Sequence, residues 1–326
     1  MSQVQKALSP ENAATNRHIE DFLTQLNSAG GKPMEQLEPK EARQVLVDAQ
    51  KSVEVNLSGI ETSEKVIIVD DHSVTLSIVR PIGHSKKLPA FMFFHGGGWI
   101  LGDFPTHKRL VRDLVVGSGA VAVFVNYTPS PEAQYPVAIN EAYAATKWVA
   151  EHGDEINVDS SRLAVAGNSV GGNMSAAVAL MAKEKGAPHI AFQLLLWPVT
   201  DANFETESYQ RYPEGFFLTR NMMKWFWDAY TTDAGKRQEL HASPLQAKPE
   251  QLAGLPPALI QVAEYDVLRD EGEAYGRKLN EAGVEVTLVR YDGLIHDYGL
   301  LNPLAEIPAV KVALAQAAGA LRHYLE

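Results

Sequence analysis

Residues 163–180 read LAVAGNSVGGNMSAAVAL, and this stretch decides the fold. Its first four residues form a short apolar run typical of a buried strand, and Val170–Lys185 is rich in the helix formers Ala and Met. Between them, Gly167-Asn168-Ser169-Val170-Gly171 matches G-x-S-x-G, whose small residues let a strand turn sharply into a helix. The pattern favours a nucleophilic serine at the carboxyl edge of a sheet, beside a helix N-terminus, over a tight glycine turn that buries Ser169.

Apolar runs alternate with amphipathic helical patterns on both sides of this stretch. The expected strands are Lys65–Val69, Val74–Arg80, Pro89–His95, Ala120–Asn126, Leu163–Gly167, Ile190–Trp197, Ala258–Ala263 and Val284–Arg290. The expected helices are Thr106–Val116, Pro136–His152, Val170–Lys185, Arg269–Ala282 and Leu304–Leu325. Apolar strands that alternate with helices indicate parallel strands covered on both faces. The sequence therefore predicts an α/β fold, with an eight-stranded, mostly parallel sheet whose first two strands form an antiparallel hairpin.

Two segments fall outside this alternation. About 60 residues separate Trp197 from Ala258, which is too long for a plain connection in a compact domain. We interpret them as a helical insertion over one edge of the sheet, and its aromatic residues either wall a substrate pocket or, for most of them, pack on the core. These residues are Phe216, Phe217, Trp225, Phe226, Trp227 and Tyr230.

The N-terminal residues are polar and helical in pattern, and Ser9-Pro10-Glu11 predicts a helix start there. We expect residues 1–55 and 200–245 to form a helical cap, and residues 56–199 and 246–326 to form the catalytic core.

Composition excludes several classes of protein. The chain has 326 residues and no cysteine, so disulfides, a Cys nucleophile and Cys-ligated metals are excluded. Its net charge is 29 − 40 = −11, which argues against nucleic acid and against anionic membrane surfaces as partners. No run of about 18 apolar residues predicts a membrane span, and no secretory signal is recognisable, so a cytoplasmic location is expected.

His95-Gly96-Gly97-Gly98 follows the expected strand Pro89–His95 and predicts an oxyanion hole. Glycines without side chains can turn their backbone N–H groups toward one point, where acyl transfer needs donors for the tetrahedral oxyanion. A further donor is expected from Val170, which follows the nucleophile. The alternatives are a flexible loop and a phosphate loop. A phosphate loop requires Lys and Ser or Thr after the glycines, whereas Trp99-Ile100 follows here. We interpret His95 itself as structural.

A serine nucleophile needs a general base, which in this chain order lies after it. Four histidines follow Ser169, namely His189, His241, His296 and His323. Only His296 lies in a loop just after an expected strand, on the carboxyl edge of the sheet, and we therefore predict it as the base.

The acid that orients the base should end another strand. Asp266 follows the strand Ala258–Ala263 and is the predicted acid. Asp292 also follows a strand, but it is only four residues from His296, which is awkward for a hydrogen bond to the ring. Glu264 is expected to point into the sheet or to accept a structural hydrogen bond. We interpret Asp270-Glu271 as acids of a first helical turn.

These motifs together resemble the bacterial hormone-sensitive-lipase-like carboxylesterases of the α/β-hydrolase superfamily. The resemblance runs from about residue 60 to the end. It is carried by His95-Gly96-Gly97-Gly98-Trp99, Asn126-Tyr127, Pro131-Glu132, Tyr135-Pro136, the Ser169 turn, Asp266-Val267-Leu268-Arg269-Asp270-Glu271 and His296. It implies a Ser169-Asp266-His296 triad, oxyanion donors at Gly97, Gly98 and Val170, and a helical cap. It also implies short acyl esters as substrates and makes pairing into a homodimer through the last strand a possibility.

The chain departs from that family at four positions. Most members carry Asp or Thr before the nucleophile, a small residue after it, Arg after the tyrosine of the middle motif, and Pro after the catalytic Asp. Here these positions hold Asn168, Val170, Thr128 and Val267. None of these side chains takes part directly in the chemistry, but the family's substrate preference does not carry over at these positions.

The sequence thus predicts a serine carboxylesterase that cleaves small-molecule esters of short to medium acyl chains through an acyl-enzyme. No metal or cofactor is required. The Asp70-Asp71-His72-Ser73 turn between the first two strands lacks a further ligand at metal-site spacing, which favours a solvated turn. An amidase or a drug-ester hydrolase would use the same residues. A non-catalytic small-molecule receptor of this fold is the other alternative, although such proteins typically lack a member of the triad.

Overall fold

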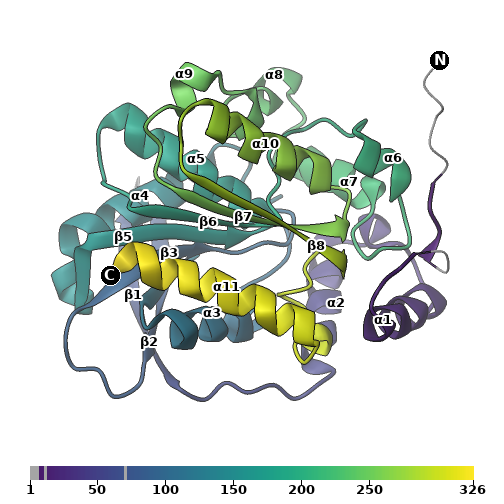
Figure 1. Ribbon diagram of the computed structural model, residues 1–326, viewed down its shortest axis with the longest axis horizontal. Helices are drawn as coiled ribbons and strands as arrows, with labels where there is room; N and C mark the ends of the chain where they lie inside the picture. The colour runs from purple at the N-terminus through teal and green to yellow at the C-terminus, as the bar shows by residue number, and fades with distance from the viewer. Residues whose placement is uncertain (1–6, 11–12, 70–71) are drawn as a thin grey trace.

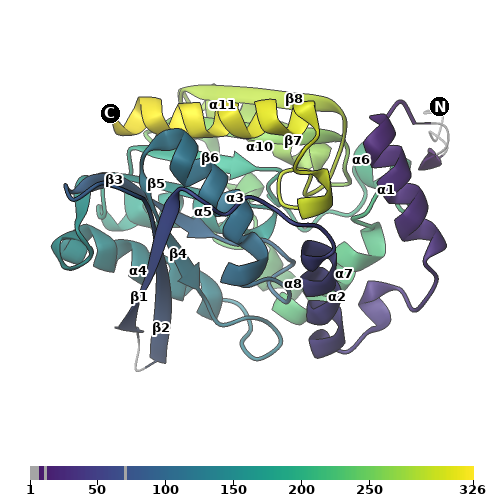
Figure 2. The same ribbon diagram turned by 90° about the horizontal axis from the view of Figure 1, so that it is seen from below.

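The computed structural model describes residues 7–10, 13–69 and 72–326. A single eight-stranded sheet runs through it in the order β1-β2-β4-β3-β5-β6-β7-β8 (Figures 1 and 2). The strands are β1 (Ile60–Val69), β2 (His72–Pro81), β3 (Leu88–Phe94), β4 (Val121–Asn126), β5 (Val158–Asn168), β6 (Phe192–Leu196), β7 (Ala258–Tyr265) and β8 (Val286–Ile295). β2 is antiparallel to both β1 and β4, and the remaining pairs are parallel. The predicted α/β fold is confirmed.

Helices cover both faces of the sheet. They are α3 (Phe104–Ser118), α4 (Val137–His152), α5 (Val170–Lys185), α10 (Arg269–Glu281) and α11 (Pro308–Leu325). α3 and α11 pack together on one face, and α4, α5 and α10 lie on the other (Figure 1). β4 is therefore almost wholly buried, as are the C-terminal parts of β3 and β5, which explains their continuous apolar runs.

Further helices lie outside this framework. They are α1 (Arg17–Ser28), α2 (Pro39–Lys51), α6 (Glu207–Arg211), α7 (Arg220–Tyr230), α8 (Ala234–Arg237) and α9 (Pro249–Leu252). Figure 2 shows α1, α2 and α7 gathered at one end of the molecule. Among the described residues, none of the helices combines the length and the apolar character needed to cross a bilayer.

Three sequence expectations need correction or fall outside the structure. The first helix does not start at Ser9-Pro10, because Asn16 accepts a hydrogen bond from the His18 N–H and caps the helix there, while the Leu8 N–H binds the Arg211 carbonyl at 2.8 Å. β8 continues to Ile295 rather than ending at Arg290. Glu11, Asp70 and Asp71 lie outside the described residues.

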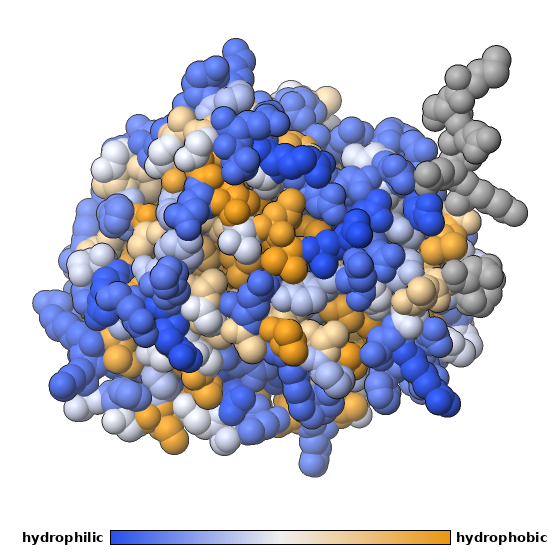
Figure 3. Space-filling view, viewed as in Figure 1, coloured by the Kyte–Doolittle hydropathy of each residue, from blue (hydrophilic) through white to orange (hydrophobic). Residues whose placement is uncertain are grey.

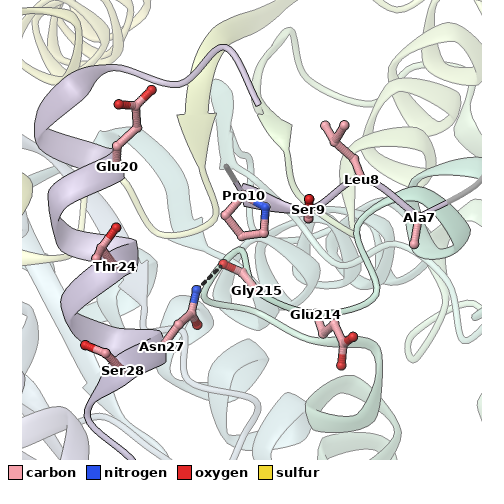
Figure 4. A pocket seen from close by; sticks show the side chains of 10 residues that line it. All are labelled: Ala7, Leu8, Ser9, Pro10, Glu20, Thr24, Asn27, Ser28, Glu214 and Gly215. Carbon is pink, nitrogen blue, oxygen red and sulfur yellow. Dashed lines mark hydrogen bonds between the residues drawn. The ribbon is translucent and has the colours of Figure 1, made fainter. Parts of the chain in front are cut away.

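The molecule also carries a hollow away from the strand ends. A cavity of about 1100 Å³ lies between the N-terminal segment, α1 and the loop at Glu214 and Gly215 (Figure 4). The Asn27 Nδ2 group donates to the Gly215 carbonyl at 3.0 Å and links its two walls. Its lining includes none of the predicted site residues. On the face that carries α11, hydrophobic residues are scattered among hydrophilic ones (Figure 3).

Candidate active site

Ser169 occupies a sharp turn between β5 and α5. Its backbone has φ 56° and ψ −120°, a conformation that residues other than glycine rarely adopt. The flanking glycines make the turn possible, because a Cβ at Gly171 would overlap the Phe94 carbonyl and a Cβ at Gly167 would overlap Gly171. The Ser169 N–H donates to the Leu196 carbonyl at 2.9 Å, which fixes the turn against β6. The geometry is the strand-to-helix turn predicted from the sequence.

The structure brings the three predicted triad residues together. His296 directly follows β8, and its Nε2 lies 3.0 Å from the Ser169 hydroxyl oxygen. Its Nδ1 lies 2.7 Å from the Asp266 Oδ2, and Asp266 directly follows β7. Ser169, His296 and Asp266 are only 4%, 2% and 1% exposed. Both are hydrogen-bond distances, as the predicted roles of a nucleophile, a base and an acid that orients the base require.

The surroundings of His296 favour its cationic form. Burial lowers the pKa of His296, but the nearby carboxylates of Asp266 and Asp297 raise it by more, so the pKa lies above its ordinary value of 6.5. Asp266 faces Nδ1, while the Asp297 Oδ2 lies 3.9 Å from Nε2 on the other side of the ring. A cation that forms on this imidazole during a reaction is therefore stabilised from both sides.

The competing acids lie elsewhere. The Asp292 side chain is 70% exposed and pairs with Arg290 at 2.8 Å. Glu264 accepts a hydrogen bond from the Gly293 N–H at 2.8 Å, a structural role that matches its expectation. Glu271 is buried rather than merely an acid of the first helical turn, and it accepts from the Thr200 N–H at 2.7 Å. Burial raises the pKa of Glu271.

The other histidines after Ser169 do not reach the site. His241 pairs with Glu184 at 2.8 Å, and the His323 ring contacts Tyr324 in α11. His189 precedes β6 and therefore lies at the opposite edge of the sheet from Ser169.

The predicted oxyanion loop, residues 95–98, contains backbone conformations that only glycine adopts freely. Gly97 and Gly98 have φ of 102° and 64°, and a Cβ at Gly97 would overlap the Leu101 carbonyl. Val170 is the first residue of α5, where helix N–H groups lack partners within the helix. The three predicted donors thus stand at the turn after β3 and at the turn after β5.

His95 packs beneath this loop. Its ring stacks on Tyr127 with centroids 4.2 Å apart, and its Nδ1 lies 2.8 Å from the Gly96 carbonyl oxygen. The Tyr127 hydroxyl donates to the His95 carbonyl at 3.0 Å. Burial lowers the pKa of His95 to about 4, so the ring is neutral near pH 7. These contacts support its interpretation as a structural group.

Asp297 is a residue that the sequence reasoning missed. Its Oδ1 accepts from the Asn168 amide at 3.0 Å and from the Trp197 indole N–H at 2.7 Å. The Asn168 Oδ1 in turn accepts from the Gly96 N–H at 3.0 Å. Asn168, one of the departures from the family pattern, therefore links the oxyanion loop to the loop of His296. The available signal was an acid placed immediately after the base.

The sheet order, the strained serine turn and the Ser169–His296–Asp266 arrangement define an α/β-class hydrolase. A family model described as alpha/beta hydrolase fold matches residues 91–300. The chain belongs to this α/β-hydrolase family, in its hormone-sensitive-lipase-like branch.

Several of its relatives are named as esterases. A carboxylesterase of Mycobacterium tuberculosis is 38% identical over 241 residues, which cover 73% of this chain and 75% of the relative. An ethyl acetate hydrolase of Pseudomonas putida is 31% identical over 293 residues, covering 87% and 91%. The crystal structure of a thermostable esterase from Pseudomonas putida matches with a TM-score of 0.95 at 66% identity, covering 96% and 98%. The protein is accordingly a carboxylic ester hydrolase.

Proposed function

We propose that the protein hydrolyses carboxylic esters of short to medium acyl chains through an acyl-enzyme on Ser169. The proposal rests on one observation: Asp266, His296 and Ser169 are joined by hydrogen bonds at the strand ends. The Ser169 oxygen attacks the ester carbonyl carbon, and His296 Nε2 takes the hydroxyl proton. Asp266 accepts the Nδ1–H, which keeps Nε2 free to act as a base, and it stabilises the resulting imidazolium.

Collapse of the tetrahedral intermediate breaks the bond to the alcohol. His296 returns its proton to the leaving oxygen, and the acyl group stays on Ser169. A water molecule, deprotonated by Nε2, then attacks the acyl carbonyl, and the carboxylic acid leaves as Ser169 regains its proton. The N–H groups of Gly97, Gly98 and Val170 stabilise the oxyanion in both halves, at about 3 kcal/mol per donor.

The cap assignment also stays a proposal, with residues 1–55 and 200–245 as cap and residues 56–199 and 246–326 as core. Contacts between the two cap segments support it. The Phe22 ring lies 6.3 Å from Phe217, and Asn27 donates to Gly215. A cap over a nearly buried Ser169 favours small substrates, and the relative named as an ethyl acetate hydrolase acts on such an ester.

Covalent labelling tests the nucleophile. A fluorophosphonate should add once to the protein, and peptide mass spectrometry should locate the adduct on Ser169. The phosphorus replaces the hydroxyl proton and fluoride leaves, a reaction that needs an activated hydroxyl and an oxyanion hole. Absence of labelling, or an adduct on a different serine, would contradict the proposed mechanism.

Phe226 is the cap aromatic that we expect to limit acyl length. Its ring occupies the space that a Cβ at Gly98 would need, so it borders the oxyanion hole directly. Phe226→Ala should raise the kcat/KM ratio of octanoyl to acetyl p-nitrophenyl esters by roughly tenfold or more, as expected for opened apolar space.

Phe204→Ala is the matched control for this change. Phe204 belongs to the same insertion, but its ring packs on Tyr209 at 5.7 Å. The control should leave the chain-length ratio near that of the parent protein. An unchanged ratio in Phe226→Ala, with the fold intact by melting temperature, would assign the Phe226 ring to packing alone.

A further inference from the structure

We propose that Arg43, on α2, positions the oxyanion loop and thereby sets the rate of acyl transfer. The inference rests on the proposed function, because it concerns the donors at Gly97 and Gly98. α2 belongs to the N-terminal segment and contributes no strand to the sheet. Arg43 binds Ile100, Ser130 and Glu132 and not the reacting atoms, so its role is to hold the backbone that presents the donors.

Arg43 makes an unusually complete set of hydrogen bonds for a side chain at the surface. Its Nε donates to the Ile100 carbonyl at 2.8 Å, and one terminal nitrogen donates to the Ser130 carbonyl at 3.1 Å. Both terminal nitrogens also bind the Glu132 carboxylate, each at 2.7 Å. The planar guanidinium thus joins two loops in a fixed geometry that a lysine ammonium cannot reproduce.

The two residues whose carbonyls Arg43 binds, Ile100 and Ser130, also form hydrogen bonds within the turn after the glycines. The Ile100 and Leu101 N–H groups donate to the Gly97 carbonyl at 3.2 Å and 2.7 Å. Ser130 donates its N–H to the Trp99 carbonyl at 2.8 Å. Arg43 therefore holds the Ile100 carbonyl directly and the Trp99 carbonyl through Ser130.

This turn needs external support. Gly97 and Gly98 have no side chains to restrain their dihedral angles, so neighbouring peptide groups must set the direction of their N–H groups. Trp99 has φ 60°, a conformation that persists in a non-glycine residue only where the surroundings enforce it. Its ring stacks on Tyr230 with centroids 3.9 Å apart, which fixes the side chain. Arg43 and Ser130 supply the corresponding restraint on the backbone.

The Arg43–Glu132 ion pair is exposed to solvent, which limits its contribution to folding stability. The side chains of Arg43 and Glu132 are 30% and 51% exposed. Ion pairs with this much solvent contact add little to folding stability. A change at Arg43 should therefore alter the loop while leaving the fold, and the binding of the uncharged ester, nearly unchanged.

The test combines turnover with a transition-state mimic. An alkyl trifluoromethyl ketone forms a hemiketal with the serine, and its oxyanion occupies the hole. In Arg43→Gln, kcat for p-nitrophenyl acetate should fall about tenfold, and the Ki of the ketone should rise by a similar factor. Misplaced donors weaken only the hydrogen bonds to the oxyanion, and these form only in the tetrahedral state. KM should stay within about twofold of the parent value. Arg43→Lys should recover part of both losses, because an ammonium can reach one carbonyl.

Arg162→Gln is the matched control. Arg162 also binds a carboxylate, that of Asp159 at 2.8 Å, and a carbonyl, that of Leu325 at 3.1 Å, but it precedes the buried part of β5 far from Ser169. It should change neither kcat nor Ki. Unchanged kcat in Arg43→Gln, a loss confined to KM, or a kcat loss without a matching rise in Ki would overturn the positioning role.

The same ketone separates this inference from the proposed function. The parent protein should be inhibited, and Ser169→Ala should not. A parent protein that the ketone does not inhibit would overturn the acyl-enzyme mechanism together with the role of Arg43. If the ketone inhibited the parent protein and Arg43→Gln with the same Ki, only the role of Arg43 would be overturned.

Discussion

Ser169→Ala should reduce turnover of p-nitrophenyl esters on the order of 10⁶-fold, leaving only the residual acceleration that substrate binding and the oxyanion donors provide. The loss follows because, in the proposed mechanism, the acyl group is carried by the Ser169 hydroxyl, which His296 activates. The fold should persist, since the Ser169 N–H bond to the Leu196 carbonyl belongs to the backbone and alanine adds no bulk. Initial rates and a thermal melt of the same preparation measure both quantities.

Ser118→Ala is the matched control for this substitution. Ser118 is a buried serine whose hydroxyl oxygen accepts one hydrogen bond, from the Ala120 N–H at 3.2 Å. It ends α3 before β4 begins, at the opposite edge of the sheet from Ser169. It should keep activity near that of the parent protein. If a clean preparation of Ser169→Ala turned over esters at an appreciable rate, Ser169 would not be the nucleophile.

The parts of the site that sequence could predict depend on one geometric rule. In a parallel sheet the carboxyl ends of strands meet at one edge, so Ser169, Asp266 and His296 were expected together although 127 residues separate the first from the last. Even an error in strand length did not disturb this prediction. β8 runs to Ile295 instead of Arg290, and this places His296 directly at the strand end.

The residues that sequence did not reveal act through contacts with no local pattern. Asp297 meets Asn168 across 129 residues, and Arg43 reaches Ile100 from a helix whose spacing shows only an amphipathic surface. Each bond depends on how loops from separate strands pack, which periodicity does not encode. The predicted helix start at Ser9-Pro10 was wrong for a related reason, because the Leu8 N–H pairs with the distant Arg211 carbonyl and the helix starts only after Asn16.

Asp266→Asn should lower kcat by about 10⁴-fold while leaving the fold intact. In the parent protein the Asp266 carboxylate accepts the Nδ1–H at 2.7 Å, and its Oδ1 accepts from the Leu268 N–H at 2.9 Å. An amide can donate to Nδ1 instead, which favours the tautomer with its proton on Nε2. An imidazole in that tautomer cannot take the Ser169 proton. The asparagine amide also lacks the negative charge that stabilises the imidazolium.

The pH profile gives this prediction a second and independent readout. The base must be neutral, so activity falls as the pH drops through the pKa of His296, which Asp266 helps to hold above its ordinary value. Removing the Asp266 charge lowers the pKa of His296. The residual kcat/KM of Asp266→Asn should therefore fall at a lower pH than the kcat/KM of the parent protein. Asp292→Asn should change neither rate nor profile, because Asp292 is solvent-exposed and pairs with Arg290. A large loss of activity in Asp292→Asn with little change in Asp266→Asn would show that Asp292, and not Asp266, orients the base.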